Sequence, residues 1–462
     1  MMTRRISAAL LAVMISFISI SVVQGQQTSA EIQGEQATKP AKKQPVNPEI
    51  LQARSAKAYE EGNWVQLYTA NMQLHQQRPW VPEYLYNMVI AAAQLDRRST
   101  AYNYMLVMQQ QGLSYDFNQS EETLNIRNSE AYNYINTLLV DAGKPAGDGE
   151  VIFSLKGKPG DFADIAWDAG RERFLLGTRR EGKLLAVTAE GESEVLLQAN
   201  EENGLWSING IAVDEVNNRL WLASAATPAY DEFTPAVLNR GALFEYELDS
   251  LKQVARFNLP VDGRVHELGH VAVTASGDVY AIDWASPVIY RKTSDSEKVE
   301  VFAGGGQLAQ LTDIAVTPDS SRVFVSDALM GVLLIDPGTQ RSAMLGGPEN
   351  LNLGGIYGLE YKGGQLYITQ SGISPQRLMR LNMNSAGTMV DAVAPMAIAL
   401  ESFDFPGAGT IMGNSLVYLA NQGSDREDGP LKVMQTPLTG GSEIKAPELP
   451  QLEETRKIRV NP

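Results

Sequence analysis

The feature that most constrains the fold is a block of about 45 residues that recurs six times between residues 150 and 438. Each block opens with a polar residue and an apolar run, such as TDIAVT, and continues through a turn into two β-rich segments, such as RVFVSD and GVLLID. Regular antiparallel units of this length are the blades of a propeller. The reference positions are Asp164, Asn209, His270, Asp313, Gly358 and Asp404, spaced by 45, 61, 43, 45 and 46 residues.

This period predicts an all-β six-bladed β-propeller over residues 150–438. The last block lacks a fourth strand, whereas the segment Val151–Leu155 precedes the first block without a partner. We expect this segment to complete the last blade and close the ring, because closure removes an exposed sheet edge.

A small α-helical domain is expected before the propeller, over residues 49–142, because apolar residues recur there at spacings of three and four. Two segments of this region resemble each other when Gly62 is aligned with Asp96, at the turn between helices. This offset is the length of a tetratricopeptide helix-turn-helix repeat. A plain pair of helical hairpins is the alternative.

The segment from Met1 to Gly25 has the pattern of a cleavable signal peptide. Arg4 and Arg5 precede an apolar run from Ile6 to Val23, and cleavage is expected after Gly25. An uncleaved membrane anchor is the alternative. The pattern predicts a protein of the periplasm or the cell exterior.

Two further segments are too polar to order themselves: residues 26–48 read as a disordered linker, and residues 439–462 as a flexible C-terminal tail. The chain has no cysteine, which excludes disulfides and thiolate metal sites. Its net charge is −16, which argues against nucleic acid or an anionic membrane face as a partner, leaving the export signal as the expected membrane contact.

The polar residues of the repeat should gather at one mouth of the propeller. In an antiparallel blade the end of the second strand lies beside the start of the first, so both open on one face. Clustered aspartates repel each other unless a cation, an arginine or a proton intervenes. Calcium, which takes six to eight oxygen ligands, is the cofactor expected if a metal is bound. The candidate metal ligands are Asn209, Asp164, Asp313 and Asp327, and the candidate catalytic residues are Asp313 and His270.

Other polar and aromatic residues near strand starts and ends could line the same mouth and bind a small molecule or peptide. They are Trp206, Asp283, Trp284, Gln370 and Asn421. The alternative for each aspartate is a structural one, in which the carboxylate accepts backbone N–H bonds of a turn. A zinc site of three histidines is excluded, because the chain has three and His75 lies in the helical region.

The blade sequences TDIAVTPDSSRVFVSDALMGVLLID, INGIAVDEVNNRLWLAS and HVAVTASGDVYAIDWASPVIYR resemble those of the senescence marker protein/gluconolactonase family of six-bladed propellers. They are also similar to the related yellow/royal-jelly propellers. The resemblance covers roughly residues 150–438 and implies the propeller fold. It also implies a lactonase that holds one divalent cation, usually calcium, through a glutamate, an asparagine and an aspartate that open inner strands.

The resemblance places only Asn209 on a matching metal-ligand position. The glutamate position falls on Ala163, and two further positions fall on Gly269 and Thr312. The polar residues are displaced by one place, to Asp164, His270 and Asp313. In a regular strand, a side chain displaced by one residue points to the opposite face of the sheet.

Two hypotheses for the function follow. The first is an exported binding or scaffold protein, whose propeller mouth holds a small ligand, peptide or cation and whose helical repeats engage a protein partner. The second is a divalent-metal-dependent lactonase or ester hydrolase of the gluconolactonase type. The displaced ligand positions favour the first hypothesis.

Overall fold

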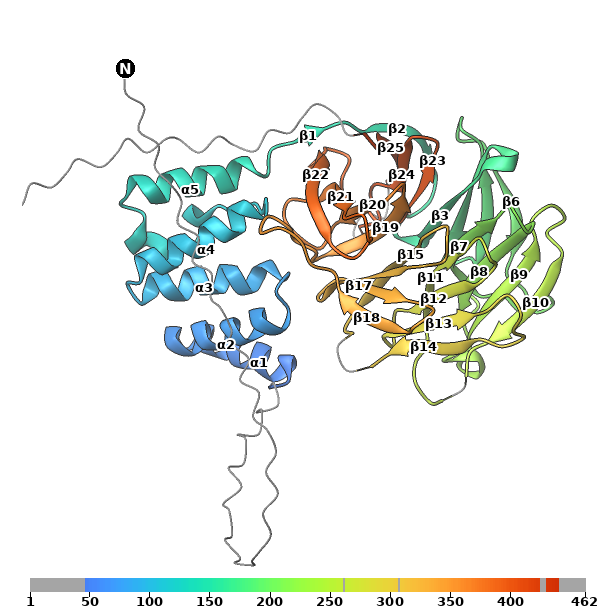
Figure 1. Ribbon diagram of the computed structural model, residues 1–462, viewed down its shortest axis with the longest axis horizontal. Coiled ribbons are helices and arrows are strands. Elements are labelled where there is room, and N and C mark those ends of the chain that lie inside the picture. Colours follow the sequence, from blue (N-terminus) through green and yellow to red (C-terminus); the bar gives the residue numbers. More distant parts are fainter. Residues whose placement is uncertain (1–45, 261, 306–307, 424–428, 440–462) are drawn as a thin grey trace, which may run out of the picture. The chain divides into compact units, whose positions relative to one another are not determined.

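The computed structural model describes residues 46–260, 262–305, 308–423 and 429–439 (Figure 1). The predicted signal peptide, nearly all of the predicted linker and nearly all of the predicted tail lie outside these residues. Across the described part of the chain, no helix has the length and apolar character needed to cross a membrane.

Five α-helices precede the strands, as expected for the helical region. They are α1 (Pro48–Glu60), α2 (Trp64–Gln77), α3 (Pro82–Gln94), α4 (Arg98–Gln110) and α5 (Glu130–Asp141). The short 3-10 helices η1 (Phe117–Gln119) and η2 (Glu121–Ile126) link α4 to α5. Helices α3 and α4 follow α1 and α2 at the predicted offset, and the turns inside both hairpins contain a left-handed residue, Gly62 (φ 64°) and Asp96 (φ 54°). The two hairpins are therefore structural repeats.

The strands that follow the helices form six antiparallel sheets, which are the blades of a six-bladed propeller (Figure 1). Blade 1 holds β3 (Phe162–Asp168), β4 (Arg173–Thr178), β5 (Lys183–Val187) and β6 (Ser193–Gln198). Blade 2 holds β7 (Ser207–Asp214), β8 (Arg219–Ala225), β9 (Gly241–Glu247) and β10 (Gln253–Asn258). Blade 3 holds β11 (Leu268–Val273), β12 (Val279–Asp283), β13 (Val288–Lys292) and β14 (Glu300–Gly304). Blade 4 holds β15 (Leu311–Val316), β16 (Val323–Asp327), β17 (Gly331–Asp336) and β18 (Arg341–Met344).

Blades 5 and 6 depart from four consecutive strands. Blade 5 holds β19 (Ile356–Lys362), β20 (Gln365–Gln370), β21 (Arg377–Met383) and β22 (Val390–Ile398), and β1 (Ala146–Gly147) pairs with β22 as a fifth strand. Blade 6 holds β23 (Gly409–Met412), β24 (Ser415–Leu419) and β25 (Leu431–Pro437), and its outer strand is β2 (Glu150–Leu155). Strand β2 is antiparallel to β25, with Leu155 opposite Leu431. The predicted closure of the ring is thus confirmed.

The innermost strand of blade 6 differs from the expected one. We placed it on SFDFPG around Asp404, whereas β23 begins at Gly409. Pro406 has no N–H to donate to a ladder, and Phe405 has a left-handed backbone (φ 62°) that no strand residue adopts. The segment that resembled a strand is a loop at the propeller mouth.

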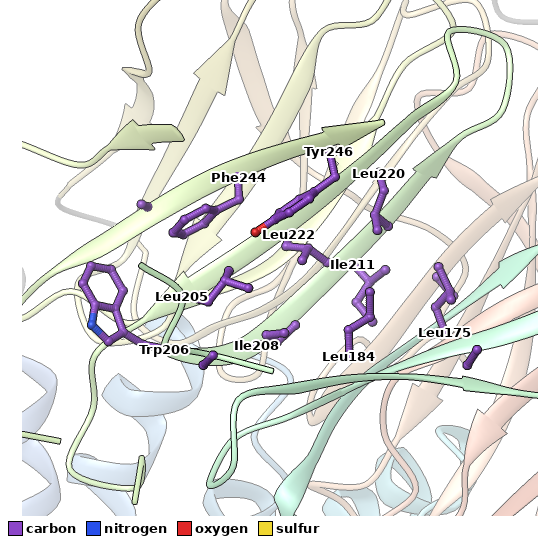
Figure 2. Close-up of a cluster of buried hydrophobic side chains, with 14 of the residues drawn as sticks. Leu175, Leu184, Leu205, Trp206, Ile208, Ile211, Leu220, Leu222, Phe244 and Tyr246 are labelled. Atoms are coloured by element: carbon purple, nitrogen blue, oxygen red, sulfur yellow. The ribbon is translucent and has the colours of Figure 1, made fainter. Parts of the chain in front are cut away.

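Neighbouring blades are held together by apolar side chains from their facing surfaces. Figure 2 shows this packing between blades 1 and 2, where Leu175 and Leu184 face Leu220 and Leu222. The same cluster contains Trp206, which is 8% exposed. Burial of such surface stabilises the fold at roughly 25 cal/mol per Å².

A β-bulge interrupts the start of the inner strand in five blades. The pairing register shifts after Phe162, Ile208, Leu268, Leu311 and Ile356. A bulge places two residues of one strand opposite one residue of its partner, which breaks the alternation of faces locally. Consequently Ala163 and Asp164 both line the central channel, although they are adjacent in the sequence.

Candidate ligand site at the propeller mouth

Three side chains meet in the channel at the centre of the propeller. Nδ1 of His270 lies 3.4 Å from Oδ1 of Asp164 and 3.2 Å from Oδ1 of Asp313. The three residues come from the bulged starts of β3, β11 and β15, and all three are buried. Two cavities of about 260 Å³ meet at this point, and His270 lines both. The group therefore forms a constriction between a mouth cavity and a channel cavity.

The two aspartates also tie neighbouring blades together. Asp164 accepts the N–H of Ile165 at 2.9 Å and, from blade 2, the N–H of Ile211 at 2.7 Å. Asp313 likewise accepts the N–H groups of Ile314 and, from blade 5, Leu359, both at 2.7 Å. Each carboxylate oxygen of the pair thus has a backbone donor.

Burial shifts the protonation of the groups at the constriction. It raises the pKa of Asp164 to about 7, and it raises the pKa of Asp313 well above its ordinary value. Burial also lowers the pKa of His270 to about 3, so its imidazole is neutral. Glu360, in the wall of the channel cavity, has its pKa raised to about 8 by burial and by the charge of Asp164. The raised pKa values favour the protonated form of these acids, and the charge of Arg179 opposes this effect at Asp164.

The donor set at the constriction does not fit a calcium ion as it stands. Calcium takes six to eight oxygen ligands, but the carboxylates of Asp164 and Asp313 are used by backbone donors and the ring of His270 lies beside both. In the described residues, no group of three or more His, Asp or Glu side chains is arranged to hold a metal. Asn209 contributes one buried oxygen, Oδ1, that has no partner. The calcium expected from the sequence stays a prediction.

The mouth cavity has a mixed wall. Its large aromatic side chains are Trp284, Tyr357 and Phe405. Besides His270, its polar side chains are those of Arg179, Gln310, Thr312 and Gln422. Tyr357, Thr312 and His270 lie at the starts of the first strands β19, β15 and β11, and the other five lie in loops that precede first strands or follow second strands, as expected from the geometry of an antiparallel blade. A cavity with apolar rings and a few convergent polar groups is the usual form of a small-molecule site.

Trp284 is positioned by its neighbours. Its backbone N–H donates to the carbonyl of Glu267, and its ring lies 5.4 Å from the ring of His270. A Cβ atom on Gly269 would lie 2.2 Å from the Trp284 ring, which is far inside contact distance. Glycine at position 269 therefore gives the indole its place in the wall of the mouth.

The predicted residues at or near the ends of second strands use their side chains to bond to the backbone of adjoining segments. Asp327 accepts four backbone N–H bonds, from residues 309, 310, 329 and 330. Asp283 accepts three backbone N–H bonds and contacts Nδ1 of His266 at 2.6 Å. Gln370 and Asn421 bond to backbone carbonyls. None of the four lines the mouth cavity.

Of the predicted residues, the structure brings together Asp164, His270 and Asp313, and it places Trp284 beside them. Trp206 lies in the hydrophobic cluster of Figure 2, under the guanidinium of Arg256. Asn209 donates from Nδ2 to the carbonyl of Leu268 and lines neither cavity.

Sequence reasoning missed several residues of the mouth, among them Arg179, Gln310, Tyr357, Phe405 and Gln422. A positional signal for two of them was present. Arg179, Trp284 and Gln422 each directly follow the last residue of the second-strand motif, at Thr178, Asp283 and Asn421. In these three blades, the residue after the end of the motif, and not its last residue, lines the cavity.

Comparison with known proteins finds distant structural similarity. No family model and no curated sequence matches the chain. Among solved structures, a gluconolactonase from Xanthomonas campestris matches with 13% identity, covering 63% of this chain and 89% of that chain, at a TM-score of 0.43. A luciferin-regenerating enzyme matches with 12% identity over 65% and 100% of the two chains, at a TM-score of 0.46. A chain of a nidogen/laminin complex matches with 17% identity over 50% and 79%, at a TM-score of 0.38.

Proposed function

We propose that this propeller binds a small organic molecule in its mouth cavity. The observation that carries the proposal is the wall of that cavity, where three aromatic rings converge with four polar side chains and with the ring of His270. The volume, about 260 Å³, lies just below the roughly 300–1,000 Å³ of sites for drug-sized ligands, so the ligand is small.

The arrangement of Gly269 and Trp284 provides the test of this proposal. In the variant Gly269→Ala, the new methyl group displaces the indole from the cavity wall, while the backbone at this position has no left-handed φ that would forbid alanine. Gly346→Ala is the matched control, because a Cβ there meets open space.

The measurement is a thermal-shift screen of the intact protein with small organic acids, amides, amines and sugars, followed by calorimetric titration. We expect at least one class to bind the native protein and the Gly346→Ala variant, and to bind Gly269→Ala at least about tenfold more weakly, which is about 1.4 kcal/mol. Binding that Gly269→Ala leaves unchanged would place the ligand elsewhere, and no binding in any class would contradict the proposal.

Hydrolysis of a lactone or ester is the second candidate function. It is supported by the acid at the constriction, since Asp164 has a pKa raised to about 7, in the range suited to a general base. The expected result is turnover of aldonolactones or homoserine lactones by native protein and Gly346→Ala, with reduced turnover by Gly269→Ala. Turnover restored to stripped protein by calcium would support the metal-dependent form of this function.

We also propose that the protein is exported and that its tetratricopeptide-like region engages a protein partner. The support for export is the pattern of residues 1–25, and cell fractionation of the native chain and an Arg4→Glu, Arg5→Glu variant tests it. One face of α3 is already covered by the chain, because Gln94 donates to the carbonyl of Glu122 and Asn125 donates to that of Ala93. A partner would therefore dock on another helical surface.

A further inference from the structure

We infer that the ligand of the mouth cavity is an organic acid, whose carboxylate pairs with Arg179. Its flat apolar part packs against the rings of Tyr357 and Phe405. This inference rests on the proposed function and names the chemical class of the ligand.

Among the described residues, the guanidinium of Arg179 has no hydrogen-bond acceptor of its own. Its Nε is buried and makes no hydrogen bond, and no carboxylate in that part of the chain forms an ion pair with the group. An arginine presents five N–H donors in a planar fork that matches a carboxylate. A buried donor without a partner is costly, so a ligand acceptor at this place is favoured.

The surroundings of Arg179 leave these donors unused. The guanidinium carbon lies 5.0 Å from the centre of the Trp284 ring, a cation–π contact that involves the face of the ring and no hydrogen-bond acceptor. The charges of Glu267, Asp161 and Asp164 favour its charged form, but burial is the larger effect and lowers the pKa of Arg179. The acids nearby thus compensate the cation only in part.

The backbone around Arg179 is fixed. Its N–H donates to the carbonyl of Asp161 at 2.7 Å, and its carbonyl accepts the hydroxyl of Ser207, from blade 2, at 2.7 Å. The carbonyl of the next residue, Arg180, accepts the N–H of Asp231 in the long loop between β8 and β9. A cation held in this way loses little additional freedom when it binds a ligand.

Another part of the cavity wall suits a flat apolar group. The rings of Tyr357 and Phe405 lie 4.6 Å apart with an angle of 61° between their planes, and the amide of Gln310 donates to the Tyr357 hydroxyl. Phe405 keeps a left-handed backbone, φ 62°, that is strained for a residue with a side chain. Such strain is found most often at functional sites, where the surrounding structure holds it.

The experiment compares acids with their neutral amides on the full-length protein. Benzoate is titrated against benzamide, and cyclohexanecarboxylate against its amide, with sulfate and inorganic phosphate as anions that lack an apolar part. The variants are Arg179→Gln, which removes the cation, and Arg180→Gln, its exposed neighbour, as the matched control. Chemical unfolding of both variants checks that the propeller is intact.

The expected result is that the acids bind the native protein and Arg180→Gln at least about tenfold more tightly than the amides, as hydrogen bonds to a charged group imply. Arg179→Gln should abolish this difference, and it should leave amide binding within about twofold, since the aromatic wall is unchanged.

Three outcomes would overturn the inference. Amides that bind as tightly as acids would leave the proposed function standing but exclude an acid as the preferred ligand. Sulfate or phosphate binding as tightly as the organic acids would exclude a role for the aromatic wall. If the native protein binds none of these compounds but binds another class in the thermal-shift screen, the ligand is not an organic acid, whereas no binding at all contradicts the proposed function as well.

Discussion

At the scale of single residues, each blade has, at or near the end of its second strand, a polar side chain that bonds to the backbone of adjoining segments. Thr178 and Ser224 each accept one backbone N–H, and Asp327 accepts four while being fully buried. These residues resemble ligands in the sequence because carboxylates recur at a regular spacing. Their atoms are nevertheless used within the protein.

Asp327 offers a direct test of that structural role. In Asp327→Asn, the amide nitrogen would face two backbone N–H donors that lose their acceptor, and we expect a loss of about 2–4 kcal/mol of unfolding free energy. Urea unfolding measures it, and the exposed Asp295→Asn should change stability by less than about 0.5 kcal/mol. Unchanged stability together with loss of a calcium-induced rise in melting temperature would instead assign Asp327 to a metal site.

The raised pKa of Glu360 leads to a prediction of how the free energy of unfolding depends on pH. Its pKa is raised to about 8 in the folded protein, so the folded state binds the proton more tightly than the unfolded state. The stabilisation is therefore fully present below the ordinary pKa of 4.5 and is lost progressively as the pH rises from there to about 8. Asp164 acts in the same direction at about pH 7, whereas His270, with its lowered pKa, acts in the opposite direction only below its ordinary value of 6.5.

We accordingly expect the melting temperature to fall from pH 6.5, above which His270 no longer opposes the acids, to about pH 8, and to level off at higher pH; Glu360→Gln should flatten that slope. Differential scanning calorimetry across this range is the measurement. Glu349→Gln, a change at an exposed glutamate, should keep the native slope. A slope that Glu360→Gln leaves intact would show that this carboxyl titrates as it does in the unfolded chain.

At the scale of elements, the propeller was predictable because its period is long and repeated, and each blade carries the same order of apolar runs and turns. The bulges were not, since a bulge adds one residue without changing the composition of a strand. The displacement by one place from Ala163 to Asp164 therefore seemed to turn the carboxylate away from the channel. In the structure, Ala163 lines the mouth cavity and Asp164 lines the channel cavity.

A residue of the mouth could be predicted from the sequence only where its position within the repeat determines that it lines the cavity. Trp284 was found because it follows a strand end, and the same position holds Arg179, which was overlooked because it follows a threonine. Phe405 could not be found, because its placement depends on a left-handed backbone within a segment that reads as a strand. A left-handed backbone that is stabilised by tertiary contacts cannot be predicted from the local sequence.

The closing strand β2 carries a prediction of its own. Phe153 is 6% exposed and its ring lies 5.4 Å from that of Phe174, whereas Val151 on the same strand is 43% exposed. Phe153→Ala should therefore cost about 3–5 kcal/mol, and Val151→Ala less than about 1 kcal/mol. Urea unfolding gives the two values, and new protease cleavage within β2 of Phe153→Ala would show that the ring opens there. Equal effects of both substitutions would contradict a closing role for the buried side of β2.

At the scale of the whole molecule, the helical region is joined to the propeller through hydrogen bonds and close packing. Arg377 on β21 is 4% exposed and donates to the carbonyls of Gln111 and Gly112 after α4, at 2.9 and 3.0 Å. Asn352 donates to the side chain of Gln111, and the N–H of Ser114 donates to a carbonyl in the β20–β21 turn. The described residues from Asn47 onward accordingly form one compact unit.

This joint predicts that the helices and the propeller unfold together, and that the coupling depends on Arg377. In Arg377→Met, a side chain of similar length fills the space but leaves the two carbonyls without a donor, so we expect a loss of about 2–4 kcal/mol and a separate, earlier transition of the helical region. Scanning calorimetry with far-ultraviolet circular dichroism distinguishes the two transitions. Arg380→Met is the matched control, because Arg380 lies on the same strand and donates to Leu438, away from the helices. A single transition in Arg377→Met, at the native temperature, would mean that the remaining contacts of the joint suffice, and that the buried guanidinium adds nothing to the coupling.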